Sequence, residues 1–92
     1  MKAHDRFVAN FIAARHALDV SQAYMAGRLR YRVTGWNTRS VTNFEGGRRA
    51  ITIAEAEVLA SLVCVPLDRM LTESATWCAD TARANSRAGA MR

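Results

Sequence analysis

The chain has 92 residues, a formal net charge of +5 and hydrophobic residues at 50% of its positions. A chain of this length folds as one small domain, and its hydrophobic content excludes an intrinsically disordered protein. Since no apolar run reaches the about 18 residues of a membrane span, we expect a cytoplasmic protein.

Apolar residues recur at helical spacing over residues 5–18, which predicts a first helix with one buried face. A second helix is expected over residues 22–29, because the Ser21 hydroxyl can accept an early backbone N–H as an N-cap. Residues 30–36 include β-branched residues and Gly35, so an extended loop is expected there.

A short third helix is predicted over residues 38–46. Asn37 is a suitable N-cap for it, and Val41 and Phe44 provide an inward apolar side. The two glycines at residues 46–47 end this helix, because glycine accepts the left-handed backbone conformation of a C-cap. The other side chains of this helix are mostly polar and are expected on its outer surface.

The second half of the chain begins with a strong helix-start signal. Thr52 and Glu55 form a predicted capping box, in which each side chain accepts the other residue's free backbone N–H, so a fourth helix starts there. Pro66 marks the start of a fifth helix, since its missing N–H costs nothing in a first turn. The predicted fold is therefore all-α, with five helices and an extended C-terminal helix. One stripe of small and apolar residues continues along that single fifth helix: Leu67, Leu71, Ala75, Cys78 and Ala82.

Basic side chains gather around the predicted third helix. Six of the 13 Lys and Arg residues fall within residues 28–49, where Glu45 is the one acid. Codon bias toward arginine does not concentrate it in one segment, so this cluster indicates a nucleic-acid-binding surface. The six are Arg28, Arg30, Arg32, Arg39, Arg48 and Arg49.

The outer face of the third helix carries side chains that can hydrogen-bond base edges in a DNA major groove. Arginine pairs with guanine, and asparagine with adenine, through two hydrogen bonds each. A short polar helix with flanking arginines is typical of an element that binds in the major groove. For one threonine of the set, Thr42, base contact and a purely shaping role both remain open. The candidates for base contact are Thr38, Arg39, Thr42 and Asn43.

The order of several residues is similar to that of a known family. These residues are Ser21-Gln22, Met25-Ala26, Val41, Glu45-Gly46-Gly47-Arg48-Arg49 and Thr52-Ile53 with Glu55. Over residues 6–72 the chain resembles the Xre or Cro type of helix-turn-helix domain, the phage repressor fold. The resemblance implies a compact λ-repressor-like domain and a sequence-specific regulator of transcription that binds double-stranded DNA. A repressor is expected rather than an activator by analogy alone.

The resemblance also implies roles for individual residues. Thr38, Arg39 and Asn43 match positions that contact bases. Glu45 matches a structural position that is often paired with an arginine of the first helix, and Arg15 is the candidate partner here. Gln22, Arg48 and Arg49 match positions that contact the DNA backbone. From the charge cluster, some of Arg28, Arg30 and Arg32 are expected to contact phosphates as well.

The loop before the third helix departs from the family pattern, which joins its second and third helices by a tight turn. Here Leu29 and Asn37 lie several residues further apart. The insertion either contacts the sugar-phosphate backbone or lengthens the second helix. Within it, we expect Trp36 to anchor the loop in the core rather than to stack on DNA, since stacking belongs mainly to single-stranded ligands.

The chain is expected to have three segments. Residues 1–72 form the DNA-binding domain, residues 73–85 a helical extension, and residues 86–92 a flexible basic tail. Part of the extension exceeds what the core requires, so it is the expected surface of a homodimer that binds two half-sites. The alternatives are that it only completes the core of a monomer or connects to a further domain. The dimerisation candidates are Ala75, Trp77, Cys78 and Ala82.

No enzyme is expected, and the sequence indicates no site for a metal, a cofactor or a small-molecule ligand. His4 and His16 lack a cysteine at ligand spacing, and no Ser/His/Asp, Cys/His or phosphate-binding glycine pattern occurs. Cys64 and Cys78 are expected to be free thiols. Two alternative functions are an antitoxin-like protein-interaction module with secondary DNA binding, and sequence-independent binding of nucleic acid driven by charge.

Overall fold

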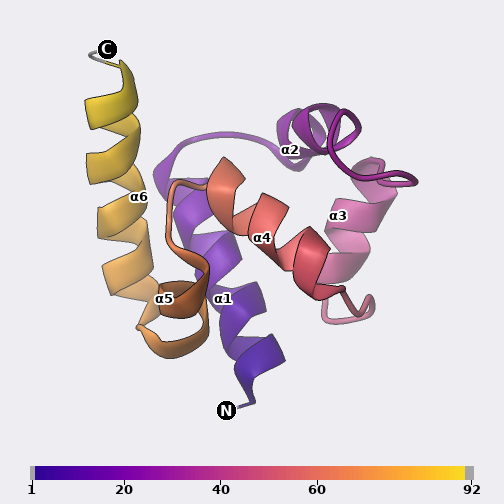
Figure 1. Ribbon diagram of the computed structural model, residues 1–92, viewed down its shortest axis with the longest axis horizontal. Coiled ribbons are helices and arrows are strands. Elements are labelled where there is room, and N and C mark those ends of the chain that lie inside the picture. Colours follow the sequence, from indigo (N-terminus) through magenta and orange to yellow (C-terminus); the bar gives the residue numbers. More distant parts are fainter. Residues whose placement is uncertain (1, 91–92) are drawn as a thin grey trace.

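A computed structural model describes the backbone of residues 2–90 and the side chains of residues 2–86 (Figure 1). This part of the chain is all-helical and contains no strand. None of its helices is both long enough and apolar enough to cross a membrane. The helices are α1 (Ala3–Ala17), α2 (Gln22–Leu29), α3 (Thr38–Glu45), α4 (Ile53–Leu62), α5 (Leu67–Thr72) and α6 (Ala75–Ala90).

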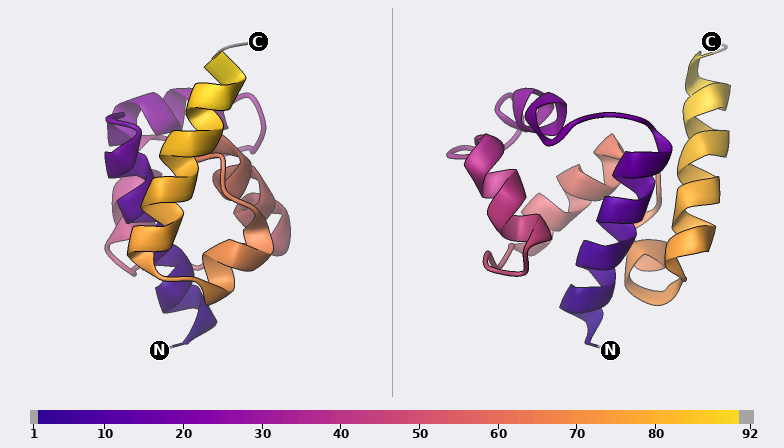
Figure 2. Two further views of the ribbon diagram at one scale, coloured as in Figure 1. Left: turned by 90° about the vertical axis from the view of Figure 1, so that its left-hand side faces the viewer. Right: turned by 180° about the vertical axis from the view of Figure 1, so that it is seen from behind.

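Helix α1 is the central element of the fold, because α3, α5 and α6 all contact it. Helix α6 runs alongside α1, whereas α2 and α3 lie on the other side of the molecule (Figures 1 and 2). The ring of Phe44 in α3 joins the two sides. Phe7 and Phe11 of α1 approach that ring edge-on, with centroids 6.0 and 5.4 Å away, and Trp36 approaches it at 6.1 Å. Aromatic packing therefore anchors α3 on α1.

The predicted N-caps are confirmed. The Ser21 hydroxyl accepts a backbone N–H in the first turn of α2. Asn37 caps α3 and forms a capping box with Ser40, which sequence analysis had not predicted. Thr52 and Glu55 form the predicted capping box at the start of α4. These short-range signals fix where three of the helices begin.

Three helices end on a residue with left-handed backbone conformation: Asp19 after α1 (φ 58°), Gly47 after α3 (φ 75°) and Cys64 after α4 (φ 62°). After each of them, the next residue's N–H donates to the carbonyl five positions earlier, over 2.8–3.4 Å. This is the Schellman arrangement, which satisfies the last carbonyls of a helix. Only Gly47 adopts it without a Cβ penalty, so Asp19 and Cys64 store backbone strain.

The prediction of one continuous fifth helix is wrong, because the chain breaks at Glu73 and Ser74 to give α5 and α6. The Asn10 amide of α1 donates to the carbonyls of Met70 (3.0 Å) and Glu73 (2.9 Å) at the end of α5. Ser74 Oγ then accepts the N–H of Trp77 (3.1 Å) and starts α6. A side chain about 60 positions away in the sequence thus binds the backbone at the break between α5 and α6.

The prediction of a dimer surface is wrong for two of its four residues. Cys78 and Ala82 are fully buried in the core cluster, on the helix that packs along α1. Neither side chain can therefore contact a second copy of the folded chain, and burial raises the pKa of the Cys78 thiol. Ala75 and Trp77 remain exposed.

Element boundaries differ from the predictions by a few positions. The first helix spans Ala3–Ala17 rather than 5–18, and α3 ends at Glu45. The predicted loop over 30–36 is present and does not lengthen α2. Helix α6 continues through Ala90, so the predicted tail does not begin at residue 86, and its last two residues lie outside the described part of the chain.

Candidate nucleic-acid interface

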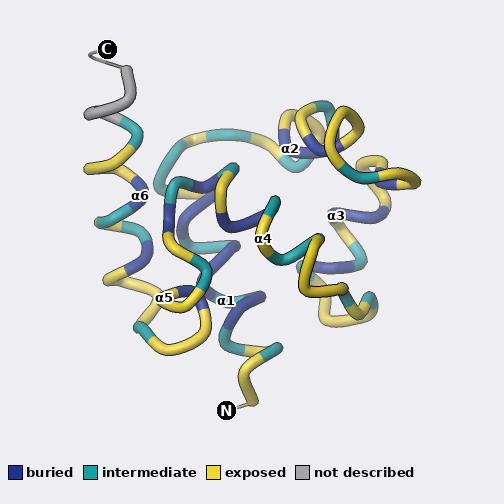
Figure 3. The backbone as a smooth tube through the Cα atoms, viewed as in Figure 1, coloured by how far each residue is buried: buried dark blue, intermediate teal, exposed yellow. Residues whose placement is uncertain are grey.

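Helix α2 has two flanks that face different parts of the molecule. The flank toward α3, here called the α3 flank, carries side chains spaced by three and four residues: Ala23, Ala26, Gly27 and Arg30. The opposite flank, here called the α6 flank, faces α6 and the C-terminal end of α4. It carries Tyr24, Met25 and Arg28, and Arg32 of the following loop lies on the same side. Figure 3 shows exposed positions along the outer sides of α2, the following loop and α3.

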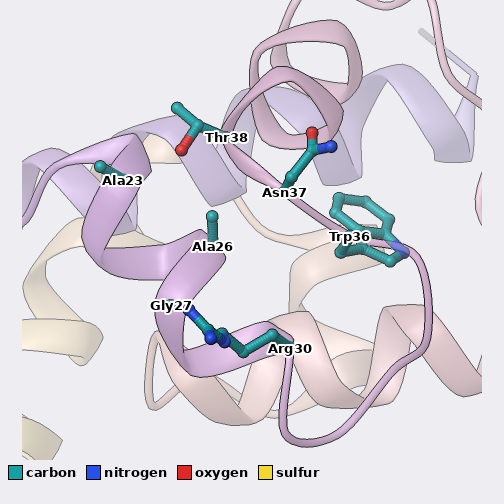
Figure 4. A pocket seen from close by; sticks show the side chains of 7 residues that line it. All are labelled: Ala23, Ala26, Gly27, Arg30, Trp36, Asn37 and Thr38. Atoms are coloured by element: carbon teal, nitrogen blue, oxygen red, sulfur yellow. The ribbon is translucent and has the colours of Figure 1, made fainter.

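A hollow of about 320 Å³ lies on the α3 flank. In Figure 4, Ala26 of α2 and Arg30, which follows α2, stand on one side of it, and Asn37 and Thr38 at the start of α3 stand on the other. Trp36 lines it as well. The small side chains of α2 leave this space open, so the first turn of α3 is accessible beside it.

A hydrogen-bond network centred on the Glu45 carboxylate fixes α3 against α1 and α2. Arg15 Nε and Nη2 donate to its two oxygens, over 2.6 and 3.0 Å. Gln22 Nε2 donates to Glu45 Oε1 (2.9 Å), and the Thr42 hydroxyl donates to Gln22 Oε1 (2.8 Å). The Arg15 and Glu45 side chains are only 10% and 8% exposed, so the ion pair is buried. The pairing of Arg15 with Glu45 that the family resemblance implied is thus present.

The four predicted base-contacting residues share the outer side of α3. Ser40, Val41 and Phe44 form its buried side. Thr38, Arg39 and Thr42 are exposed, and Asn43 is half-buried. Arg39 makes no hydrogen bond or ion pair with any described residue, whereas the Thr42 hydroxyl is already bonded to Gln22. Arg39 is therefore the most available member of the set.

The two arginines after α3 point to different places. Arg48 is exposed and folds back over Gly46, where a Cβ atom would lie 2.6 Å from its Nη1. Its Nη2 is 3.4 Å from Asn43 Oδ1, so Arg48 extends the polar surface of α3. Arg49 turns inward, and its guanidinium lies 4.5 Å from the centre of the Trp36 ring. Arg49 therefore has structural contacts within the chain, and its predicted contact with DNA phosphate stays a prediction.

Trp36 anchors the loop, as predicted. Its indole N–H donates to Glu55 Oε2 (2.6 Å), and Arg49 Nη2 lies 3.8 Å from the same oxygen. The Thr52 backbone N–H, the Trp36 indole and the Arg49 charge together hold the pKa of Glu55 below its ordinary value, with the Thr52 bond contributing most. The inserted loop is therefore attached to the start of α4.

The arginines of α2 and the loop divide between its two flanks. Arg30 lies on the α3 flank, with its guanidinium 5.6 Å from the centre of the exposed Tyr31 ring. Arg28 and Arg32 lie on the α6 flank, where Arg32 Nη1 donates to Ser61 Oγ (3.1 Å). Of these three arginines, only Arg30 therefore lies beside α3, and the predicted phosphate contacts stay a prediction.

No protein-family model, curated protein or solved structure matches this chain. The function of the surface must follow from its own geometry and charge. Between residues 20 and 54 the one acid is Glu45, and the buried Arg15 neutralises it. The surface around α3 therefore carries arginine charge without compensating carboxylates.

The open hollow beside α3 was not predicted from the sequence. The signal was the spacing of Ala23, Ala26 and Gly27, because three small residues at helical spacing leave a shallow face on one side of a helix. The hydrogen bonds of Gln22 with Glu45 and Thr42 of α3 were not predicted either. One Gln22 amide hydrogen is committed to Glu45, which leaves the second for another acceptor.

Proposed function

We propose that this protein is a sequence-specific double-stranded DNA-binding regulator with a λ-repressor-like helix-turn-helix domain. In this proposal α2, the long loop and α3 form the helix-turn-helix unit, and α3 is the recognition helix. One observation carries it: the outer side of α3 presents Arg39 and Thr38 to solvent, while the buried Arg15–Glu45 ion pair and the Gln22 bond to Glu45 hold the helix in place.

The dimensions of α3 suit a major groove. An α-helix with its side chains is about 10–12 Å in diameter, and the major groove of B-DNA is about 12 Å wide, so the exposed side of the eight-residue α3 can enter it. Arg39 is the candidate for a bidentate contact with guanine O6 and N7, and Asn43 for a contact with adenine. A fixed recognition helix loses little conformational entropy on binding, which favours discrimination between base pairs.

Contacts with phosphates position such a helix without specifying sequence. Arg30 on the α3 flank, Arg48 after α3 and the remaining Gln22 amide hydrogen are the candidates. Arg28, Arg32 and Arg49 are not part of this proposed interface. Regulation then follows from occupancy of a promoter, and a repressor is the simplest form of it.

The test is selection of the tightest binders from a random duplex pool, followed by fluorescence anisotropy with a salt titration. Enrichment of one motif that random DNA displaces poorly supports the proposal. Two charged phosphate contacts predict a log–log salt slope of about −1.8. A palindromic motif with half-sites about one helical turn apart also indicates a homodimer.

Two results oppose the proposal. Equal affinity for every duplex indicates charge-driven, sequence-independent binding. Absence of binding at about 50 mM salt, where weak phosphate contacts still register, removes the DNA function. In that case co-purification with a second protein tests the interaction-module alternative.

A further inference from the structure

A second hollow, of about 290 Å³, lies on the α6 flank of α2. The end of α4 and the helix α6 complete its walls. Leu18, Val20 and Leu62 are half-buried and line the hollow, and the buried Met25 lies among them, so the three half-buried side chains form an apolar floor. The floor distinguishes this hollow from a purely polar surface depression.

Two arginines stand at the rim of this hollow. Arg28 and Arg32 are exposed and line it, together with the Ser61 hydroxyl that Arg32 contacts. Neither guanidinium forms an ion pair with a carboxylate of the described residues. Asp19 lies next to the lining residues in the chain but pairs with neither arginine. The rim thus presents two cations above an apolar surface.

This combination indicates the chemical class of the occupant. A guanidinium binds a carboxylate through two parallel hydrogen bonds, and apolar floor area favours a ligand with an apolar body. Small-molecule pockets start at about 300 Å³, so the hollow accommodates a fragment-sized molecule. Inorganic phosphate would use the rim and leave the floor uncovered.

We propose that the hollow on the α6 flank binds a small organic carboxylate. Its carboxylate pairs with Arg28 and Arg32, and its apolar body covers Leu18 and Leu62. The ligand bridges α2 and the end of α4 and therefore stabilises the folded chain. This proposal does not depend on DNA binding, because it uses the flank of α2 that faces away from α3.

The test is a ¹H–¹⁵N NMR titration of the full chain with benzoate. Benzamide is the uncharged isostere, and acetate and inorganic phosphate are anions without an aromatic body. We expect saturable benzoate shifts at Val20, Arg28 and Leu62, with a Kd of about 1 mM, and at least about tenfold weaker binding of the other three probes.

Charge-neutral variants test the two arginines. Arg28→Gln and Arg32→Gln are each expected to weaken benzoate binding about tenfold. Arg30→Gln is the matched control, because Arg30 is close in sequence but lies on the α3 flank, and it should leave the benzoate Kd unchanged. All three positions are exposed, so folding should persist.

Three results overturn the proposal. One is the absence of saturable benzoate shifts up to about 20 mM, well above the expected Kd. A second is equal affinity for benzoate, acetate and phosphate, which indicates anion binding at the rim without use of the floor. The third is an equal effect of Arg30→Gln and Arg28→Gln, which assigns the binding to overall charge.

Discussion

The two flanks of α2 carry arginines in different surroundings. On the α3 flank, small side chains leave space beside α3, and Arg30 shares that side with an exposed polar helix. On the α6 flank, Arg28 and Arg32 stand above an apolar floor. These arginines lie within five positions of one another and still belong to different surfaces. Arg28 and the C-cap Arg30 differ because residues two apart on a helical turn point in different directions, and Arg32 lies in the loop after the helix. Charge clustered in a sequence does not by itself define one binding face.

The largest expected effect concerns the buried hydrogen-bond network that fixes α3, the helix opposite the α3 flank, against α1 and α2. Glu45→Ala leaves the Arg15 guanidinium buried without its carboxylate, so we expect the free energy of unfolding to fall by about 3–5 kcal/mol. Urea denaturation at pH 7 measures it.

An exposed ion pair provides the control for that change. Arg83 Nη2 lies 2.7 Å from Asp80 Oδ1, a similar distance, but both side chains are largely exposed. Asp80→Ala should therefore change stability by less than about 1 kcal/mol. Similar losses for Glu45→Ala and Asp80→Ala would show that burial of the network contributes nothing.

The next effect compares backbone strain at two helix ends, Gly47 after α3 and Cys64 after α4. A Cβ at Gly47 meets no atom within 4 Å, so Gly47→Ala introduces backbone strain alone and should destabilise the protein by about 1–2 kcal/mol. Cys64, which lines the hollow on the α6 flank, already carries that strain. Cys64→Gly should therefore stabilise the protein, by up to about 1 kcal/mol. Thermal denaturation checks both, and a loss of stability in Cys64→Gly contradicts the strain assigned to Cys64.

The smallest effect concerns the pH dependence contributed by Glu55, which anchors Trp36 beside the α3 flank. The pKa of Glu55 is lowered in the folded chain, so its carboxylate stabilises the fold above its unfolded pKa of about 4.3. That stabilisation is lost as the pH falls through the folded pKa. Glu55→Gln should cost about 1 kcal/mol at pH 7, and the difference from wild type should shrink in acid. A difference that stays constant from pH 7 to about pH 3 would exclude this role.

Short-range features of the fold were predictable from the sequence. The caps at Ser21, Asn37 and Thr52 involve residues three apart, so the local sequence contains both partners. The break between α5 and α6 was not predictable, because Asn10 supplies the bonds from about 60 positions away. Helical spacing predicted the apolar stripe that contains Cys78. It did not predict that α1 packs against the part of this stripe that lies on α6.

The candidate site was predictable to a similar extent. The outer residues of α3 follow from helical spacing, and the structure brings Thr38, Arg39 and Thr42 to one side. The direction of Arg49 depends on Trp36, which reaches it through an irregular loop. Loops of this kind have no period from which side-chain directions can be inferred.

The most direct test of the DNA proposal compares one arginine from each surface on the same selected duplex. Fluorescence anisotropy would give the Kd of wild type, Arg39→Ala and Arg28→Ala at one salt concentration. Loss of a base contact at Arg39 predicts binding weaker by about 1–3 kcal/mol and reduced discrimination at one base pair, with Arg28→Ala within about twofold of wild type. An Arg28→Ala loss equal to or larger than that of Arg39→Ala would contradict the assignment of α3 as the DNA-binding surface.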